Sequence, residues 1–319
     1  MTYTRRSLLA MTASLGGLTL APATASMPAP AAHPKTAHRK RTRFGINASD
    51  AQAVDLRESL CGGSIGIARV FYAGMLPNRW NPSKEGASPQ RECQVSFKAD
   101  PAAVAAGHYD REIVAWLNTI PSGWRVYLTY WHEPNDELRE GRFTAGTYRA
   151  AWSRLSHLAH QRARLKRHVV LRLVPVFMAY NIGNPRYWSD AWVPRPTEVA
   201  FLSWDIYGNP SGGGGLSGPY SSAHKRINPC LRVTQRLGFE RWGVSEFNTP
   251  TRTWDRDESA RREWLNDFRK YALSQDRSVG RHLGAPRTMM LWEGRGVNWN
   301  QTFQTAASWR WWSGVANSG

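Results

Sequence analysis

The sequence predicts a single-domain α/β fold, a (β/α)8 TIM barrel, and three observations favour this class. Eight short apolar runs alternate with segments of helical periodicity along residues 44–319. No second block of strands follows them, and no glycine-rich phosphate-binding turn joins the first run to its helix, which disfavours an open doubly wound sheet. The chain has 319 residues, enough for the roughly 250 that one barrel needs.

The predicted strands are short runs rich in β-branched and aromatic residues, which favour extended backbone. In chain order they cover residues 44–47, 65–72, 94–99, 125–133, 169–177, 199–207, 241–246 and 288–292. The fifth is a continuous apolar run, as expected of a parallel strand that is covered on both faces. All carboxyl ends of such strands meet at one face of the barrel, so that face should carry the functional site.

Between these runs, apolar residues recur at helical spacing. The segment 147–162 shows this clearly, because Tyr148, Trp152 and Leu155 share one helical face. The predicted helices are 51–60, 109–119, 147–162, a helix that ends near residue 237, 263–274 and 302–315.

The N-terminus has the pattern of an export signal. Residues 1–25 combine the twin-arginine pair Arg5 and Arg6, a mildly apolar stretch and a small-residue cleavage site that ends at Ala25. A membrane anchor is disfavoured because the apolar stretch is short and is interrupted by glycine and proline. Residues 26–43 are rich in proline, alanine and basic residues, which is typical of a solvated linker. We therefore expect twin-arginine export to the extracellular space, with residues 44–319 as the folded domain.

The chain is strongly basic, with a formal net charge of +18. Residues 1–43 contain seven Lys/Arg and no Asp or Glu, which leaves +11 on residues 44–319. Such a balance is compatible with nucleic acid or another anionic polymer. The sequence has no nucleic-acid-binding motif, however, and the basic residues are scattered, so a solvated basic surface is the preferred interpretation. We expect no nucleic-acid partner, no membrane insertion and a monomer.

Three cysteines permit at most one disulfide in an exported protein. In the predicted barrel, Cys61 and Cys93 precede neighbouring strands, which makes them the better pair. Cys230 is then expected to be a buried thiol in a helix.

Two glutamates follow apolar runs directly. Glu133 ends the fourth predicted strand, where Pro134 cannot continue a sheet ladder, and Glu246 ends the seventh. Cleavage of a glycosidic bond needs two such carboxyl groups on either side of the bond. Groups about 5–5.5 Å apart retain the anomeric configuration, and groups about 6.5–9.5 Å apart invert it.

Polar and aromatic residues near the other strand ends are candidates for substrate contact. Tyr207, Arg69 or His132 would keep one carboxylate ionised. Asp205 is either a hydrogen-bond partner of the acid or a strand-end cap, and His132 is either a sugar contact or a core histidine. Tryptophan rings stack on the apolar faces of sugars. Several of the sixteen tryptophans should instead be core residues because of their helical phase, namely Trp116, Trp152, Trp264 and Trp311. The predicted substrate-binding residues are His132, Tyr207, Trp292, Trp204, Asp205, Arg69, Asn47 and Trp299.

The motif His132-Glu133-Pro134-Asn135, together with Ser245-Glu246-Phe247, resembles clan A of the glycoside hydrolases. Histidine before the first glutamate is similar to family 26, the β-mannanases and their relatives, as is the segment 204–207. The resemblance implies that Glu133 is the acid/base, Glu246 is the nucleophile and the reaction is retaining. It also implies a polysaccharide substrate, mannan or a related hemicellulose, and neither a metal nor an organic cofactor.

Two other functions remain as alternatives, a barrel that binds polysaccharide without cleaving it and a secreted serine esterase. The segment 62–66 has the spacing of an esterase nucleophile elbow around Ser64, but it lies between a predicted helix and a strand, in the wrong order. A zinc-protease motif is disfavoured because Asp136 stands where a second histidine is needed and Pro134 breaks a helix. The glycine run 212–215 lacks the residues of a phosphate loop and is interpreted as a flexible loop.

Overall fold

The computed structural model describes residues 42–208, 215–275, 283–294 and 302–316. The chain divides into two units, Met1–Arg39 and Lys40–Gly319. The predicted signal segment 1–25 and nearly all of the predicted linker 26–43 lie outside the described residues, and both stay predictions.

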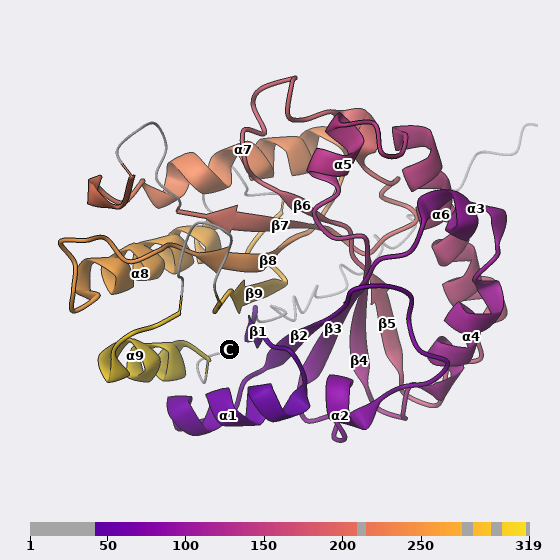
Figure 1. Ribbon diagram of the computed structural model, residues 1–319, viewed down its shortest axis with the longest axis horizontal. Helices are drawn as coiled ribbons and strands as arrows, with labels where there is room; N and C mark the ends of the chain where they lie inside the picture. Colours follow the sequence, from indigo (N-terminus) through magenta and orange to yellow (C-terminus); the bar gives the residue numbers. More distant parts are fainter. Residues whose placement is uncertain (1–41, 209–214, 276–282, 295–301, 317–319) are drawn as a thin grey trace, which may run out of the picture. The chain divides into compact units, whose positions relative to one another are not determined.

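The folded unit contains a parallel sheet in the order β5-β4-β3-β2-β1-β9-β8-β7-β6. Its strands are β1 Arg43–Asn47, β2 Ile67–Tyr72, β3 Glu92–Phe97, β4 Arg125–Tyr130, β5 Val170–Leu173, β6 Val176–Met178, β7 Leu202–Tyr207, β8 Trp242–Asn248 and β9 Thr288–Leu291. The two outermost strands of this order, β5 and β6, are separated along the chain only by Val174 and Pro175. The sheet therefore curls round to meet itself, and the predicted (β/α)8 fold class is confirmed (Figure 1).

The fifth barrel strand is not continuous, in contrast to the predicted strand 169–177. Val174 N donates to Leu128 O of β4 (2.9 Å), whereas Pro175 O accepts from Ser203 N of β7 (3.0 Å). Proline has no N–H for a sheet ladder. The run consequently breaks at Pro175, where its pairing changes from one neighbouring strand to the other.

The helices lie outside the sheet (Figure 1). They are α1 Ala51–Cys61, α2 Pro82–Glu85, α3 Pro101–Ala106, α4 Asp110–Thr119, α5 Asn135–Arg139, α6 Ala145–His157, α7 Ala223–Arg236, α8 Ser259–Leu273 and α9 Ala306–Ala316. The six predicted helices are present with shifted ends, whereas α2, α3 and α5 were not predicted. Both α2 and α3 begin with a side-chain cap, Asn81 or Asp100, followed by proline. This pair of residues is a start signal for a helix.

The main core lies between the sheet and the helices. Trp116 and Trp152 are buried there, as predicted. At the C-terminus the fully buried ring belongs to Trp312, whereas Trp311, the predicted core residue, is only partly buried. Inside the barrel a polar layer replaces part of the usual aliphatic filling. Its members are Gln94, Thr129, Ser203 and Ser245, and their side chains hydrogen-bond to one another.

The three cysteines are buried and free, so the preferred Cys61–Cys93 pair is wrong. The prediction placed Cys93 before its strand. Because β3 begins at Glu92, Cys93 is instead fixed inside the ladder and packed in the core. Cys230 is a buried helix thiol in α7, as predicted.

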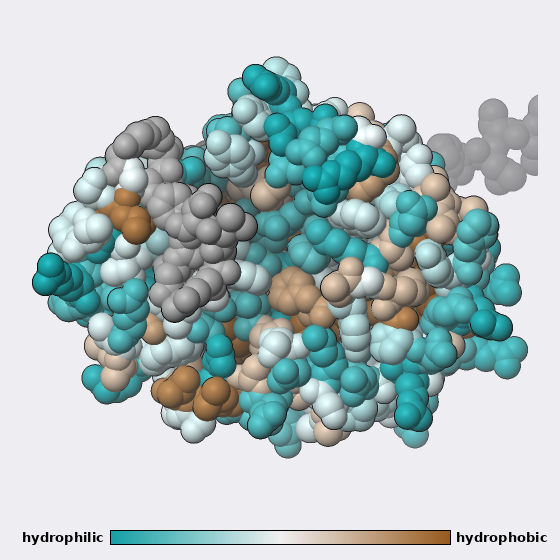
Figure 2. Space-filling model, in the orientation of Figure 1, coloured by the Kyte–Doolittle hydropathy of each residue, from teal (hydrophilic) through white to brown (hydrophobic). Residues whose placement is uncertain are grey.

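Hydrophilic side chains cover most of the face shown in Figure 2. An apolar patch in this view lies over α1, whose exposed leucines are Leu56 and Leu60. No helix in the described ranges is both long and apolar enough to cross a bilayer. The segment 62–66 ends α1 and leads into β2, which is the opposite order to an esterase elbow.

Candidate active site

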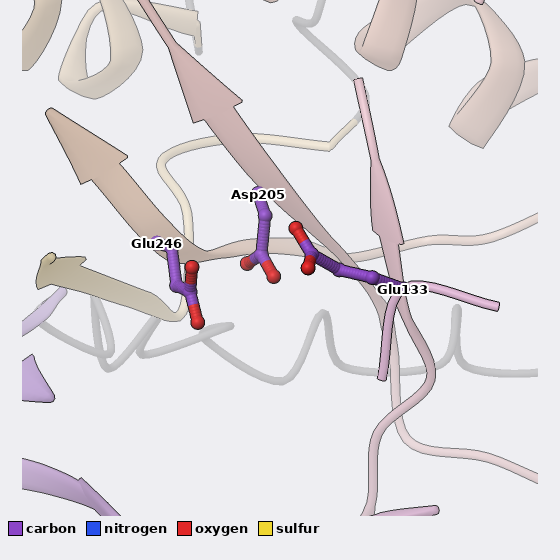
Figure 3. Close-up of side chains that lie close together, drawn as sticks. All are labelled: Glu133, Asp205 and Glu246. Carbon is purple, nitrogen blue, oxygen red and sulfur yellow. The ribbon is translucent and has the colours of Figure 1, made fainter. Parts of the chain in front are cut away.

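Three carboxyl groups converge at the carboxyl ends of the strands. Glu133 follows β4, Asp205 lies in β7 and Glu246 lies in β8. One carboxylate oxygen from each residue lies within 4.8 Å of the other two. Figure 3 shows the three side chains pointing toward one another, with Asp205 between the two glutamates. The structure thus brings together the two glutamates that the sequence singled out.

Glu133 is held in a strained turn rather than at the last position of its strand. β4 ends at Tyr130, and Trp131 and Glu133 have φ angles of 42° and 52°, which non-glycine residues rarely adopt. The turn is fixed by hydrogen bonds to the next strand. Glu133 N donates to Val176 O (2.9 Å), and the Asn135 side chain bonds both the N–H and the C=O of Met178 (2.9 and 3.2 Å). Strain of this kind persists only where the surroundings enforce it and is concentrated at functional sites.

A β-bulge directs Glu246 into the barrel. Trp204 pairs with Val244, but the next residue, Asp205, pairs with Glu246, so Ser245 is extra on β8. Ser245 Oγ bonds Gln94 and Ser203 inside the barrel, and Glu246 also points inward. Two adjacent side chains therefore share one face, which regular alternation forbids. The predicted strand end at Glu246 is also corrected, because β8 continues to Asn248.

The Arg69 guanidinium is fully buried beside the acidic group, that is, the carboxyl groups of Glu133, Asp205 and Glu246. Its Nη1 lies 2.8 Å from Glu246 Oε1, 3.3 Å from each Asp205 oxygen and 3.2 Å from Ser245 O. The Tyr207 hydroxyl donates to the other oxygen of Glu246. Glu246 thus receives one charged and one neutral donor, from two of the residues predicted to hold it. In the described part of the chain, Arg69 Nη2 and His132 Nδ1 have no hydrogen-bond partner.

Burial and mutual repulsion give the three carboxyl groups different pKa values. Burial, followed by the charge of Glu246, raises the pKa of Glu133 to about 8. The same two causes raise the pKa of Asp205 well above its ordinary value. Burial also leaves the pKa of Glu246 above its ordinary value, although Arg69 and the Tyr207 hydroxyl offset part of that rise. Glu246 is therefore the group that ionises most readily, while Glu133 holds a proton at neutral pH.

Aromatic side chains form the rim beside Arg69. The Phe71 ring lies 5.2 Å from His132 and 6.0 Å from Trp292, and the Arg69 guanidinium carbon lies 4.8 Å from its centroid. Burial, then Arg69 and Lys98, lower the pKa of His132 well below its ordinary value, so its imidazole is neutral. Sequence reasoning missed Phe71, which stands two residues after Arg69 and hence on the same face of β2.

Several predicted site residues lie elsewhere. Trp204 is fully buried, and its indole N–H donates to Thr234 Oγ1 of α7 (3.0 Å), so its predicted role as a sugar platform is corrected. Asn47 uses its amide to hold the backbone of Glu293, with an N–H···O distance of 2.7 Å, instead of offering it to a ligand. Trp299 lies outside the described residues.

The acidic group could also ligate a cation, since it supplies three carboxylate oxygens at short range. Among the described residues, this is the group of carboxylates whose spacing could hold a metal ion. Arg69 contacts two of its three members, Asp205 and Glu246, and supplies a positive charge to them. The donors that the chain itself provides thus account for the clustering of the carboxyl groups.

Comparison with known proteins shows the fold at low sequence identity. No family model and no curated protein sequence matches the chain. A β-1,3-glucanase and allergen of Cryptomeria japonica pollen superposes with a TM-score of 0.53 at 14% identity, over 79% of this chain and 89% of that one. The family 26 domain of an endo-β-mannanase/endo-β-glucanase from Prevotella bryantii gives 0.50 at 12%, over 87% and 89%.

A family 26 β-(1,4)-mannanase from Podospora anserina gives 0.50 at 12% identity, over 85% of this chain and 60% of that one. The chain therefore shares its fold with these glycanases.

Proposed function

We propose that the protein is a secreted, retaining glycoside hydrolase that cleaves β-linked polysaccharide with Glu133 as acid/base and Glu246 as nucleophile. One observation carries this proposal. The nearest carboxylate oxygens of the two glutamates are no more than 4.8 Å apart, which is nearer to the carboxyl separation of retaining enzymes, about 5–5.5 Å, than to the about 6.5–9.5 Å of inverting enzymes.

The electrostatics of the site support these roles. A protonated Glu133 would donate its proton to the glycosidic oxygen while Glu246, held by Arg69 and Tyr207, attacks the anomeric carbon. Formation of the glycosyl ester removes the negative charge of Glu246. Because that charge is one cause of the raised pKa of Glu133, the pKa then falls and Glu133 becomes the base that activates water.

The proposed substrate is mannan or a related hemicellulose. The structural neighbours include proteins described as a β-(1,4)-mannanase and an endo-β-mannanase/endo-β-glucanase. The partly exposed rings of Phe71 and Trp292 offer apolar surface for a sugar face beside the two glutamates.

The test measures hydrolysis of a panel of β-mannans and β-glucans by wild type, Glu133→Gln, Glu246→Gln and the surface control Glu240→Gln. We expect Glu133→Gln to lower kcat by about 10²–10⁴-fold, the usual contribution of general acid catalysis. The loss should be smaller for an aryl glycoside whose leaving group needs no proton. Glu246→Gln should lose turnover on both substrates. For the wild type, NMR of the first product should show that the anomeric configuration is retained. Turnover that survives both substitutions would contradict the assignment of Glu133 and Glu246 as catalytic residues. Polysaccharide binding without any turnover by the wild type would instead support a barrel that binds polysaccharide without cleaving it.

A further inference from the structure

A groove lies on the flank of the barrel, and its lining includes none of the three carboxyl groups. It lies between α7 and α8, which neighbour each other on the outside of the sheet (Figure 1). Its volume is about 680 Å³, within the range of about 300–1,000 Å³ that ligand sites occupy. The indole N–H of Trp264 on α8 donates to Ser221 O just before α7, and Tyr271 donates to Asn228 Oδ1 (2.5 Å). These bonds tie the two helices together beneath the groove.

One face of α8 provides the polar part of the lining. Glu263, Asp267 and Lys270 recur at helical spacing along the groove. In the described part of the chain, their side chains make no hydrogen bond or ion pair. The lining extends from Ala260 in α8 to Ser274, the C-cap of this helix, or about 21 Å at the helical rise. The groove is thus long enough for several linked sugars and carries carboxylates that are free to accept hydrogen bonds from hydroxyl groups.

An aromatic platform stands at one end. Tyr220 lines the groove, and its position is fixed because its hydroxyl donates to Asp255 Oδ2 (2.7 Å) and the Arg252 guanidinium lies over its ring (4.6 Å). Trp254 packs edge-on against Tyr220 at 5.7 Å and is 54% exposed. An exposed ring on a rigid support can stack against a sugar without a large loss of conformational entropy.

The charges of the groove select the class of ligand. The protein is strongly basic, yet the α8 lining carries two carboxylates and one ammonium group. This local sign disfavours nucleic acid and anionic polysaccharide, because like charges repel. Adjacent rings, hydroxyls and carboxylates suit a neutral polyhydroxylated chain. We infer that the flank groove between α7 and α8 binds a second stretch of neutral β-glycan. This inference rests on the proposed function for the identity of the polymer.

The groove is separate from the catalytic residues. Both helices pack on outward-facing side chains of the sheet. Trp204 bonds α7 through Thr234, and Phe247 stacks on Phe268 of α8 with ring centroids 5.1 Å apart. Glu246, the neighbour of Phe247, points to the opposite face. A chain bound on the flank would therefore hold the polymer near the enzyme without touching the reacting bond.

The test uses soluble galactomannan and soluble mixed-linkage β-glucan as probes in native affinity electrophoresis. Glu246→Gln is the parent, so that the polymers stay intact, and Trp254→Ala, Asp267→Asn and the surface control Glu240→Gln are added to it. We expect Trp254→Ala and Asp267→Asn each to weaken polymer binding by about two- to tenfold, the effect of one lost ring contact or hydrogen bond. Glu240→Gln should change nothing. In the wild-type background, kcat/KM on a short aryl glycoside should remain unchanged in both groove variants.

Equal binding by the parent and both groove variants would overturn the inference. So would a parallel fall of kcat/KM on the aryl glycoside, or failure of the parent to bind either polymer. The outcome is independent of the proposed hydrolysis. If the wild type cleaves none of the glycans but Asp267→Asn still weakens polymer binding, the groove stands and the hydrolase proposal falls. If Glu133→Gln and Glu246→Gln lose turnover while the groove variants bind normally, the reverse holds.

Discussion

One buried guanidinium lies beside three carboxyl groups in this site and contacts two of them. Arg69 makes its shortest contact with Glu246 and longer ones with Asp205. If all three carboxyl groups were ionised, the buried group would carry an excess of two negative charges, which a site of low polarity does not tolerate. Protons must therefore remain on the members that Arg69 holds least well. The assignment of Glu133 as the acid follows from this shortage of positive charge.

The raised pKa of Glu133 predicts a pH-dependent stability. The pKa is about 8 in the folded protein and about 4.3 in an unfolded chain, so between these values the folded state binds more protons than the unfolded state. The contribution of Glu133 is then fully present below about pH 4.3 and is lost as pH rises through about 8. Glu133→Gln, which mimics the protonated acid, should gain stability over wild type at pH 9 relative to pH 5, by an amount on the order of a few kcal/mol.

Urea denaturation of both proteins at the two pH values measures this difference. Glu240→Gln, which removes an exposed carboxylate, is the control for a general change of charge. A gap between Glu133→Gln and wild type that stays constant or shrinks as pH rises would show that Glu133 is not held in its protonated form.

The site residues that could be predicted are those governed by strand ends and alternation. Asp205 and Tyr207 are two positions apart on β7 and share the inner face. The same rule places Trp204 on the outer face, away from the site. It also places Phe71 with Arg69, although Phe71 carries no polar atom to attract notice. Neither the bulge at Ser245 nor the positive φ angle of Glu133 is marked by a glycine, and Pro134 signals only that the strand stops.

At the scale of the elements, Pro175 indicates a break in the fifth strand, although the apolar composition of residues 169–177 predicts a continuous one. A run of aliphatic residues predicts a covered strand, but proline within it requires a break in the ladder. The capped starts of α2 and α3, Asn81-Pro82 and Asp100-Pro101, were likewise present in segments for which no helix was predicted. In these segments proline and helix-capping residues therefore predict the ends of the elements better than hydropathy does.

The pairing of β1 with β2 depends on a close approach of their backbones at Gly45. A Cβ atom at this position would lie 1.9 Å from Ile67 O, a backbone atom that cannot move aside without breaking the ladder. Gly45→Ala should therefore destabilise the fold by about 3 kcal/mol or more, at or above the upper range of ordinary overpacking.

Gly74→Ala is the matched control, because a Cβ there meets nothing within 4 Å, and its stability should change by no more than about 1 kcal/mol. Thermal and urea unfolding compare the two variants with wild type. Equal stability of Gly45→Ala and Gly74→Ala would contradict the close packing of β1 on β2.

At the scale of the whole molecule, closure of the barrel brings residues that are far apart in the sequence close together in space. Alternating strands and helices predict this closure, and with it the meeting of Glu133 and Glu246. The same pattern says little about the loops and outer helices that select a sugar, because their conformations depend on contacts made only after closure. The flank groove between α7 and α8 is an example. Its lining combines residues 220–224 with one face of α8. The sequence of neither segment predicts that the two lie side by side.

Export is the remaining property that concerns the entire chain, and we propose that residues 1–25 direct it. The proposal rests on Arg5 and Arg6 ahead of an apolar stretch and on small residues up to Ala25. In a bacterium with a twin-arginine system, the full chain should appear in the exported fraction with Ser26 as its first residue, measured by mass spectrometry. Replacing both Arg5 and Arg6 with lysine keeps the charge but should abolish export, whereas Arg39→Lys in the linker should not affect it. Exported protein that retains residues 1–25, or export that survives the double replacement, would refute the signal.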